Sequence, residues 1–116
     1  MQTRIVAIVP TGPNQCRAIP AHVHVDAGDE INWINLTGDE ITIFFPSSAR
    51  VLAAPPANDV APGIGHGKKA DENANFAVKA RGGQNGLRDG SYPFSVHCKL
   101  TNNFAEGDSA PSIEVP

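Results

Sequence analysis

The sequence predicts an all-β protein, a Greek-key β-sandwich of seven or eight strands, and three observations carry this prediction. Apolar and polar residues alternate with a period of two in several short runs. The 11 Gly and 10 Pro residues separate these runs with frequent turn signals. Between residues 4 and 45 no run has a helical period. At 116 residues the chain is expected to form one domain, residues 1–116.

The first two expected strands lie at residues 4–9 and 22–25. The first is rich in β-branched residues, and the turn signal Pro10-Thr-Gly-Pro13 is expected to end it. In the second, side chains alternate, so its valines face the core and its histidines face away. These residues are Val23 and Val25 on the inner face and His22 and His24 on the outer face.

The next two strands are expected at residues 30–35 and 41–45. A turn at Asp26-Ala-Gly-Asp29 precedes the first of them, in which Ile31 and Trp33 point inward. Residues 41–45 are nearly all apolar, as expected for a strand that is buried on both faces or that crosses the core.

Between residues 46 and 90 the pattern is weaker. Residues 51–62 are rich in Ala and Pro and are expected to be irregular, with a short helical turn near residues 50–54. The Gly-rich stretch at residues 63–69 is expected to lie outside the core, and residues 75–79 alternate well enough for a strand.

The end of the chain supplies the remaining expected strands, which begin near Tyr92 and at residues 112–115. In all the expected strands the apolar residues fall on one face. The predicted core consists of Val23, Val25, Ile31, Trp33, Ile43, Phe76, Tyr92, Phe94, Val96 and Ile113.

Charge and composition argue against several classes of function. The formal net charge of −3 offers no electrostatic footprint for nucleic acid or for an anionic membrane. No apolar run approaches the ~20 residues that span a bilayer, and no signal peptide is recognised. Clustered acids such as Asp26, Asp29 and Glu30 do not form the spaced carboxylate pair of a glycosidase. We therefore expect a non-enzymatic protein.

The two cysteines, Cys16 and Cys98, are far apart in the sequence. They form no C-x-x-C spacing, which excludes a zinc ribbon or a thioredoxin motif. From spacing alone they can be two free thiols or one disulfide. A bridge would contribute roughly 4 kcal/mol in the chain-entropy model and would imply an oxidising compartment.

Three segments carry a resemblance to a known family. They read Pro20-x-x-Val23-x-Val25-x-x-Gly28-Asp29-x-Ile31-x-Trp33-x-Asn35, Tyr92-Pro-Phe94-Ser-Val96 and Pro111-Ser-Ile113-Glu-Val115. The first resembles the second and third strands of cupredoxins of the plastocyanin and azurin type, and the others resemble the last two strands. The resemblance covers most of the chain apart from residues 46–90 and implies a cupredoxin-like sandwich.

The copper ligands of the cupredoxins are missing from the matching positions. A blue-copper site needs two imidazoles and a thiolate, usually with an axial thioether. Ile41 is nearest the expected place of the first histidine, and Val96 occupies the thiolate position. Residues 99–109 contain neither His nor Met. The sequence therefore predicts a cupredoxin-like domain without a type 1 copper site and without a cofactor.

The resemblance also bears on the cysteines, because copper-free cupredoxin-like domains carry a cysteine in each of these places. It favours a Cys16–Cys98 disulfide. The competing interpretation is a reactive Cys98 thiol beside His97, with metal or redox chemistry. A thiolate–imidazole hydrolase is less favoured, since adjacent residues of a strand point to opposite faces.

Four histidines and one asparagine are further candidate site residues. His22 and His24 are close enough in a strand to share a metal, although two solvated surface residues are the favoured interpretation. His97 can join them only if the two strands are neighbours. His66, between glycines, is expected to be exposed and without a role. Asn35-Leu-Thr37 matches a glycosylation sequon, but Asn35 is expected to close the turn after its strand.

Taken together, these residues predict a non-enzymatic cupredoxin-like domain that serves as a binding or structural module. We expect a bacterial protein that is periplasmic or secreted, with a protein partner or a second copy of itself as the partner. The alternative is a variant copper-binding or electron-transfer protein that uses Cys98 with His97 or with His22 and His24. Free cysteines would instead indicate the cytoplasm.

Overall fold

The computed structural model describes residues 2–12, 15–64, 73–99, 103–105 and 111–116 of the chain. Most of these residues lie in β-strands, which confirms the predicted all-β sandwich. In chain order the elements are β1 (Thr3–Gly12), β2 (Gln15–Ile19), β3 (His22–His24), β4 (Glu30–Asn35), β5 (Ile41–Phe44), α1 (Ser48–Val51), a 3-10 helix (Ala57–Asp59), β6 (Val60–Ile64), β7 (Asn73–Ala77), β8 (Gly90–Pro93), β9 (Ser95–Cys98), β10 (Asn103–Phe104) and β11 (Ser112–Val115).

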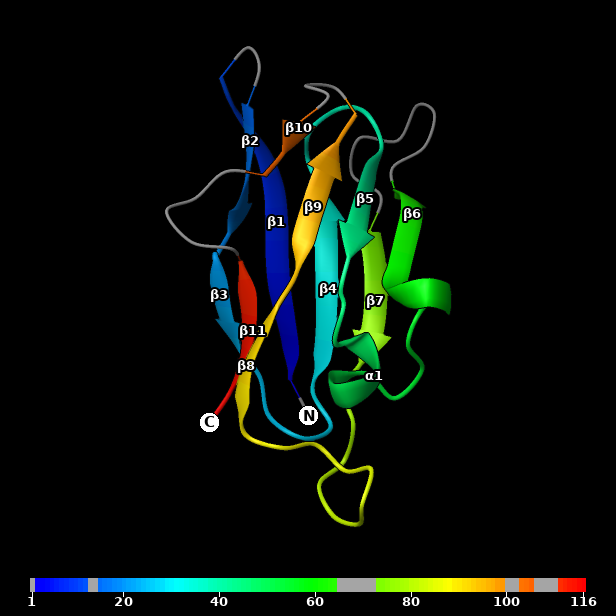
Figure 1. Cartoon of the computed structure of the whole chain (residues 1–116). Helices are drawn as coiled ribbons and strands as arrows, with labels where there is room; N and C mark the ends of the chain where they lie inside the picture. Colours follow the sequence, from blue (N-terminus) through cyan, green and yellow to red (C-terminus); the bar gives the residue numbers. More distant parts are fainter. Residues whose placement is uncertain (1, 13–14, 65–72, 100–102, 106–110) are drawn as a thin grey trace.

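The strands form three hydrogen-bonded sheets that pack as two layers (Figure 1). One layer is the sheet β2-β1-β4-β7, in which β1 runs parallel to β4 and antiparallel to β2. The other layer contains β3-β11-β8 and β10-β9-β5-β6, which are continuous because only Phe94 separates β8 from β9. The parallel pairing of β3 with β11 places the last strand beside one from the first quarter of the chain.

The core lies between the layers and centres on Trp33 of β4. Its indole meets the rings of Phe45, Phe94 and Phe76 edge-on, at centroid distances of 6.3, 5.6 and 5.7 Å. Such edge-to-face contacts add specific geometry to the burial of large apolar area. Nine of the ten predicted core residues are buried. Phe76 is the exception and is half-buried, because β7 is an edge strand.

Strand β1 does not end at the predicted turn. It continues through Pro10 to Gly12, with a register shift between these two residues where it pairs with β2. Proline is tolerated at such an irregularity because a ladder hydrogen bond is already lost there. Strand β2 was not predicted, since its buried side chains, Cys16 and Ala18, are small and give a weak apolar signal.

The segment after β5 is more regular than predicted. The helical turn lies at Ser48–Val51, slightly earlier than expected, and Val60–Ile64 forms strand β6 in a stretch predicted to be irregular. Its Pro and Gly residues are compatible with a strand because β6 is an edge of its sheet. Ile64 is buried, although it was expected to lie outside the core. Residues 65–69, with His66, are outside the described residues.

Strands β5 and β7 also differ in detail from the prediction. Strand β5 is buried on one face only, because Ile41 and Ile43 are covered whereas Thr42 and Phe44 are half-exposed. Strand β7 begins and ends two residues before the predicted range, and Val78 forms an isolated bridge with Leu52 instead. This bridge attaches the segment after α1 to the edge of the first layer.

Candidate functional site

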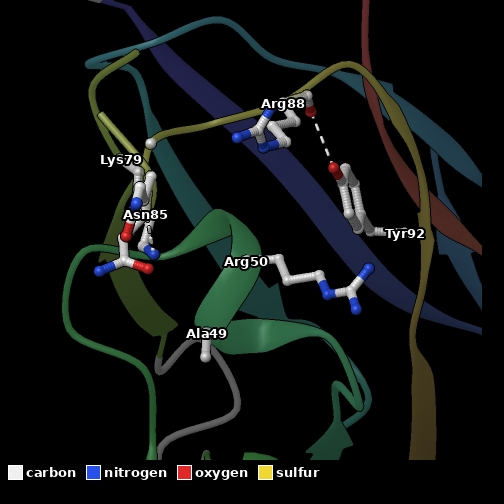
Figure 2. Close-up of a pocket in the computed structure, with 8 residues that line it drawn as sticks. Ala49, Arg50, Lys79, Asn85, Arg88 and Tyr92 are labelled. Atoms are coloured by element: carbon white, nitrogen blue, oxygen red, sulfur yellow. Dashed lines mark hydrogen bonds between the residues drawn. The ribbon is translucent and has the colours of Figure 1, made fainter. Parts of the chain in front are cut away.

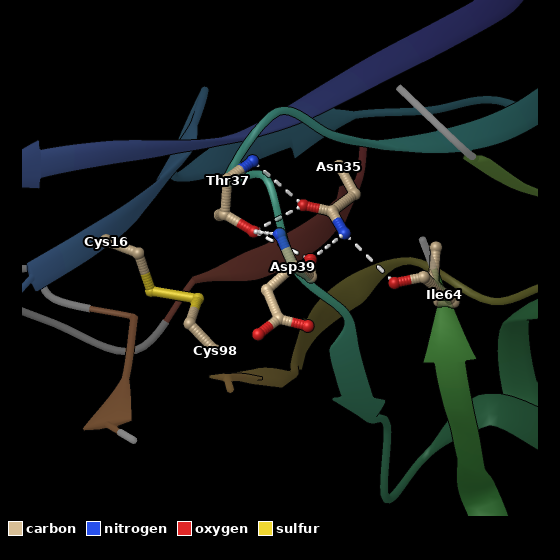
Figure 3. Close-up of a disulfide and its surroundings, with 6 residues drawn as sticks. All are labelled: Cys16, Asn35, Thr37, Asp39, Ile64 and Cys98. Carbon is tan, nitrogen blue, oxygen red and sulfur yellow. Dashed lines mark hydrogen bonds between the residues drawn. A yellow bond between two sulfur atoms is a disulfide. The ribbon is translucent and has the colours of Figure 1, made fainter. Parts of the chain in front are cut away.

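The Cys16–Cys98 disulfide lies at one end of the sandwich and confirms the pairing expected from the resemblance (Figure 3). The two Cα atoms are 6.7 Å apart, and both side chains are fully buried. Cys16 lies opposite Pro10 in the β1–β2 ladder, whereas Cys98 lies opposite Ile41 in the β5–β9 ladder. The bond therefore joins the two layers of the sandwich covalently.

Asn35, at the end of β4, closes the same end with hydrogen bonds (Figure 3). Its buried Nδ2 donates to the carbonyl oxygens of Asp39 at 2.5 Å and Ile64 at 2.9 Å. Its Oδ1 accepts from the backbone N–H of Thr37 at 2.9 Å and from the Thr37 hydroxyl at 2.7 Å. The amide thus uses both donors and accepts twice, which confirms the predicted structural role of Asn35.

The positions that match copper ligands in cupredoxins also lie at this end, and they are filled by packed side chains. Ile41 is 1% exposed and Val96 is fully buried. Cys98 is the nearest sulfur along the chain, and it is already bonded to Cys16. We call this region, defined by Cys16, Cys98 and the Asn35 amide, the disulfide end.

The predicted histidine pair belongs to a polar cluster on the outer face of β3, β11 and β8. His22 and His24 lie opposite Ser112 and Glu114 in the parallel β3–β11 pairing. The Nδ1 atom of His22 is 2.8 Å from the Ser112 hydroxyl, which donates to Glu114 Oε2 at 2.6 Å. The Ser91 hydroxyl donates to the same carboxylate oxygen at 2.5 Å.

The hydrogen bonds of this cluster stabilise the Glu114 carboxylate, and their direction is not that of a catalytic serine–histidine dyad. The Ser112 hydroxyl lowers the pKa of Glu114 most, the Ser91 hydroxyl adds to it, and burial opposes both. The positive charges of His22 and His24 lower this pKa further. Because Ser112 gives its only proton to Glu114, it must accept from His22, the reverse of a serine activated by a histidine base. Its side chain is also buried.

The structure does not bring His97 to the histidine pair. His97 lies on β9, opposite Thr42 and Phe104, in a different sheet from β3. Its ring contacts Phe104 edge-on at 5.3 Å. Within the described part of the chain, no three His, Cys, Asp or Glu side chains are grouped so that they could hold a metal ion.

The opposite end of the sandwich carries a pocket of about 420 Å³, which sequence reasoning missed (Figure 2). Helix α1 forms one side, and the segment from Lys79 to Tyr92 forms the other. Three cationic side chains, of Arg50, Lys79 and Arg88, line it together with Ala49, Gln84, Asn85, Gly86 and Tyr92. The only sequence signal was the density of Gly, Lys and Arg between residues 79 and 90. We call this region the pocket end.

Comparisons with known proteins find solved structures that are similar to this chain in fold. No family model matches the chain, and no curated protein matches it. Among solved structures, two mutants of amicyanin in the oxidized state have TM-scores of 0.49 and 0.48 at 13% and 14% identity, and in both the match covers 97% of this chain and 82% of theirs. Lac15 from a marine microbial metagenome has a TM-score of 0.46 at 10% identity, covering 99% of this chain and 32% of its own.

Amicyanin is a cupredoxin, the family whose strand motifs this sequence resembles. At such low identity and with such scores, the likeness carries no argument about copper or electron transfer in this chain.

Proposed function

We propose that this chain is a non-enzymatic, cupredoxin-like binding domain that works without a type 1 copper centre. The observation that carries the proposal is the Cys16–Cys98 bond, because it occupies the sulfur closest to the position of the thiolate ligand. A sulfur in a disulfide cannot serve as the thiolate of a blue-copper site. The buried Ile41 and Val96 side chains support the same conclusion.

The disulfide also supports a location in an oxidising compartment. We propose that the protein is bacterial and works in the periplasm or outside the cell. No helix among the described residues is long and apolar enough to cross a membrane. The proposed partner is another protein or a second copy of this chain.

The second candidate is a variant copper-binding or electron-transfer protein that uses Cys98. It is favoured by the position of His97 directly beside Cys98 in β9, and by the His22–His24 pair. It requires that the disulfide be reduced first. His97 and Cys98 also point to opposite faces of β9, since His97 is half-exposed and Cys98 is fully buried.

Copper titration separates the two candidates. We expect that Cu(II) added to the oxidised protein gives no intense visible charge-transfer band. The titration is repeated on protein reduced with a phosphine and then freed of reductant under nitrogen. The matched control is the Cys16→Ala/Cys98→Ala variant. An intense band with one copper per chain that the control lacks would overturn the proposal and establish a cysteine thiolate as a ligand; its persistence in Cys16→Ala would assign that ligand to Cys98.

A further inference from the structure

The pocket end holds its cations on segments that are distant in sequence but tied together by backbone bonds. The N–H of Lys79 donates to the carbonyl of Val51, the last residue of α1, at 2.8 Å. This bond holds the backbone next to Arg50 against the segment after β7 that carries Lys79. Tyr92 donates from its hydroxyl to the carbonyl of Arg88 at 2.8 Å, which fixes the backbone of the third cation (Figure 2).

The loop that closes the pocket is also ordered by its own contacts. The N–H of Leu87 donates to the carbonyl of Ala80 at 2.9 Å, and the Leu87 side chain is buried. The ammonium group of Lys79 donates to the carbonyl of Asn85 at 2.8 Å. A Cβ on Gly86 would lie 2.2 Å from the carbonyl oxygen of Gly82, so only glycine fits this crossing. The backbone around the pocket is therefore ordered before any ligand arrives, which lowers the entropy cost of binding.

The charge in this pocket is not balanced by neighbouring acids. No Asp or Glu is among the described residues that line it. The described acids nearby have other partners. Asp89 and Asp26 pair with Arg81 at 3.0 and 3.7 Å, and Asp29 pairs with Arg4 at 3.3 Å. The Asp59 carboxylate accepts from the Ser48 hydroxyl of α1. Three cationic side chains thus line one pocket in a protein whose formal net charge is −3. Such a cavity raises the local concentration of anions.

We propose that this pocket binds the phosphate group of a small phosphate monoester. Two guanidinium groups and one ammonium group suit a dianion better than a single carboxylate, and guanidinium can bind phosphate oxygens in a bidentate manner. The volume of about 420 Å³ is typical of small-molecule sites and leaves room for an organic group beside the phosphate. Ala49 and the Tyr92 ring line the pocket and offer apolar contact to that group.

This inference goes beyond the proposed function and does not depend on the copper titration. We test it by isothermal titration with phenyl phosphate and with benzoate, at a fixed ionic strength near physiological. The two probes share a ring and differ in the charge of the anionic group. Phenyl phosphate is expected to saturate at one site per chain and to bind at least about tenfold more tightly than benzoate. Equal affinity for the two probes would overturn the assignment to a phosphate.

Two variants localise the site. Arg50→Gln and Arg88→Gln each remove one exposed cation while keeping the backbone bonds, and each should weaken phenyl phosphate binding by about tenfold. Arg17→Gln removes the same charge from exposed β2 near the disulfide end and should leave the affinity unchanged. Thermal melting of all three verifies that they fold. An equal loss in Arg17→Gln, or no saturable binding by the parent protein, would refute the proposal.

Discussion

The two ends of this sandwich are held together by different kinds of contact. At the disulfide end, the layers are joined by the Cys16–Cys98 bond and by the four hydrogen bonds of Asn35, and these three side chains are fully buried. At the pocket end, a backbone hydrogen bond from Lys79 to Val51 connects α1 with the segment before β8, and exposed ion pairs such as Arg81–Asp89 lie within that segment. The polar groups at the first end are satisfied, whereas the second end displays cations that have no acidic neighbour among the described residues of the pocket.

This difference separates stability from binding within one small domain. Buried, fully satisfied polar groups stabilise one arrangement of the chain but offer nothing to a ligand. Exposed cations around a preformed cavity contribute little to folding, since surface ion pairs are weak, but they can attract an anion. In this protein the end that corresponds to the metal end of a cupredoxin carries groups that stabilise the fold. The opposite end carries groups that are available to a ligand.

The strongest test of this contrast removes the covalent bond. The Cys16→Ala/Cys98→Ala variant should lose about 2–5 kcal/mol of unfolding free energy, because the unfolded chain regains the entropy of a large open loop. Urea denaturation followed by Trp33 fluorescence measures the change. Reduction of the parent protein should give a similar loss and should have no effect on the variant. A loss below 1 kcal/mol would show that non-covalent packing suffices at the disulfide end.

A second test removes the amide at that end. Asn35→Ala should cost about 2–3 kcal/mol, since it removes the Asn35 partner of the buried Ile64 carbonyl and of the buried Thr37 N–H. The matched control is Asn32→Ala in the same strand, where the buried Oδ1 has no hydrogen-bond partner among the described residues. The control should cost clearly less in the same urea experiment. Similar costs for both would mean that the Asn35 network is not a main support of the disulfide end.

The smallest expected effect is a pH dependence that arises at the pocket end. Asp29 has a pKa below its ordinary value of 3.8, chiefly because its carboxylate accepts from the backbone N–H of Asp26. Burial opposes this shift, while the N–H of Gln2 and the side chain of Arg4 add to it. Since the folded protein favours the charged form, Asp29 stabilises the fold above about pH 4, and this contribution is lost as the pH falls through the lowered pKa.

Asp29→Asn should therefore flatten the fall in unfolding free energy below pH 4, measured by urea denaturation at a series of pH values. Asp89→Asn is a suitable control, because it removes a carboxylate that is 69% exposed at the same end. A slope left unchanged by Asp29→Asn would show that other carboxyl groups govern the acid response.

Much of the fold could be predicted from the sequence, because strong alternation leaves few choices of register. Residues 30–35 form β4 as predicted, with Ile31 and Trp33 buried, since large apolar residues on one face specify the inner side of a strand. Strands β2 and β6 were missed for the opposite reason. The first buries only small side chains, and the second contains Pro and Gly that a sheet tolerates only at its edge.

The two ends also differ in how well the sequence predicts their position. The cysteine pair and Asn35 stood out as individual residues, and the family resemblance supplied the pairing. The pocket could not be found in this manner, because Arg50 and Arg88 come to line the same pocket through tertiary contacts such as the Leu52–Val78 bridge and the Lys79–Val51 hydrogen bond. The grouping of exposed cations around one pocket depends on tertiary contacts, and it leaves no periodic pattern in the sequence.

The parallel pairing of β3 with β11 has a consequence for how the chain reaches its native state. His22 and Ser112 are 90 residues apart, so an open chain must close a very long loop before this sheet can form. Once Cys16 and Cys98 are joined, the route through the bridge shortens to about twenty residues, which reduces the entropic cost of closure by roughly 1.3 kcal/mol. The bond at one end of the molecule thereby makes the meeting of its first and last quarters a nearly local event, and folding rates follow such locality.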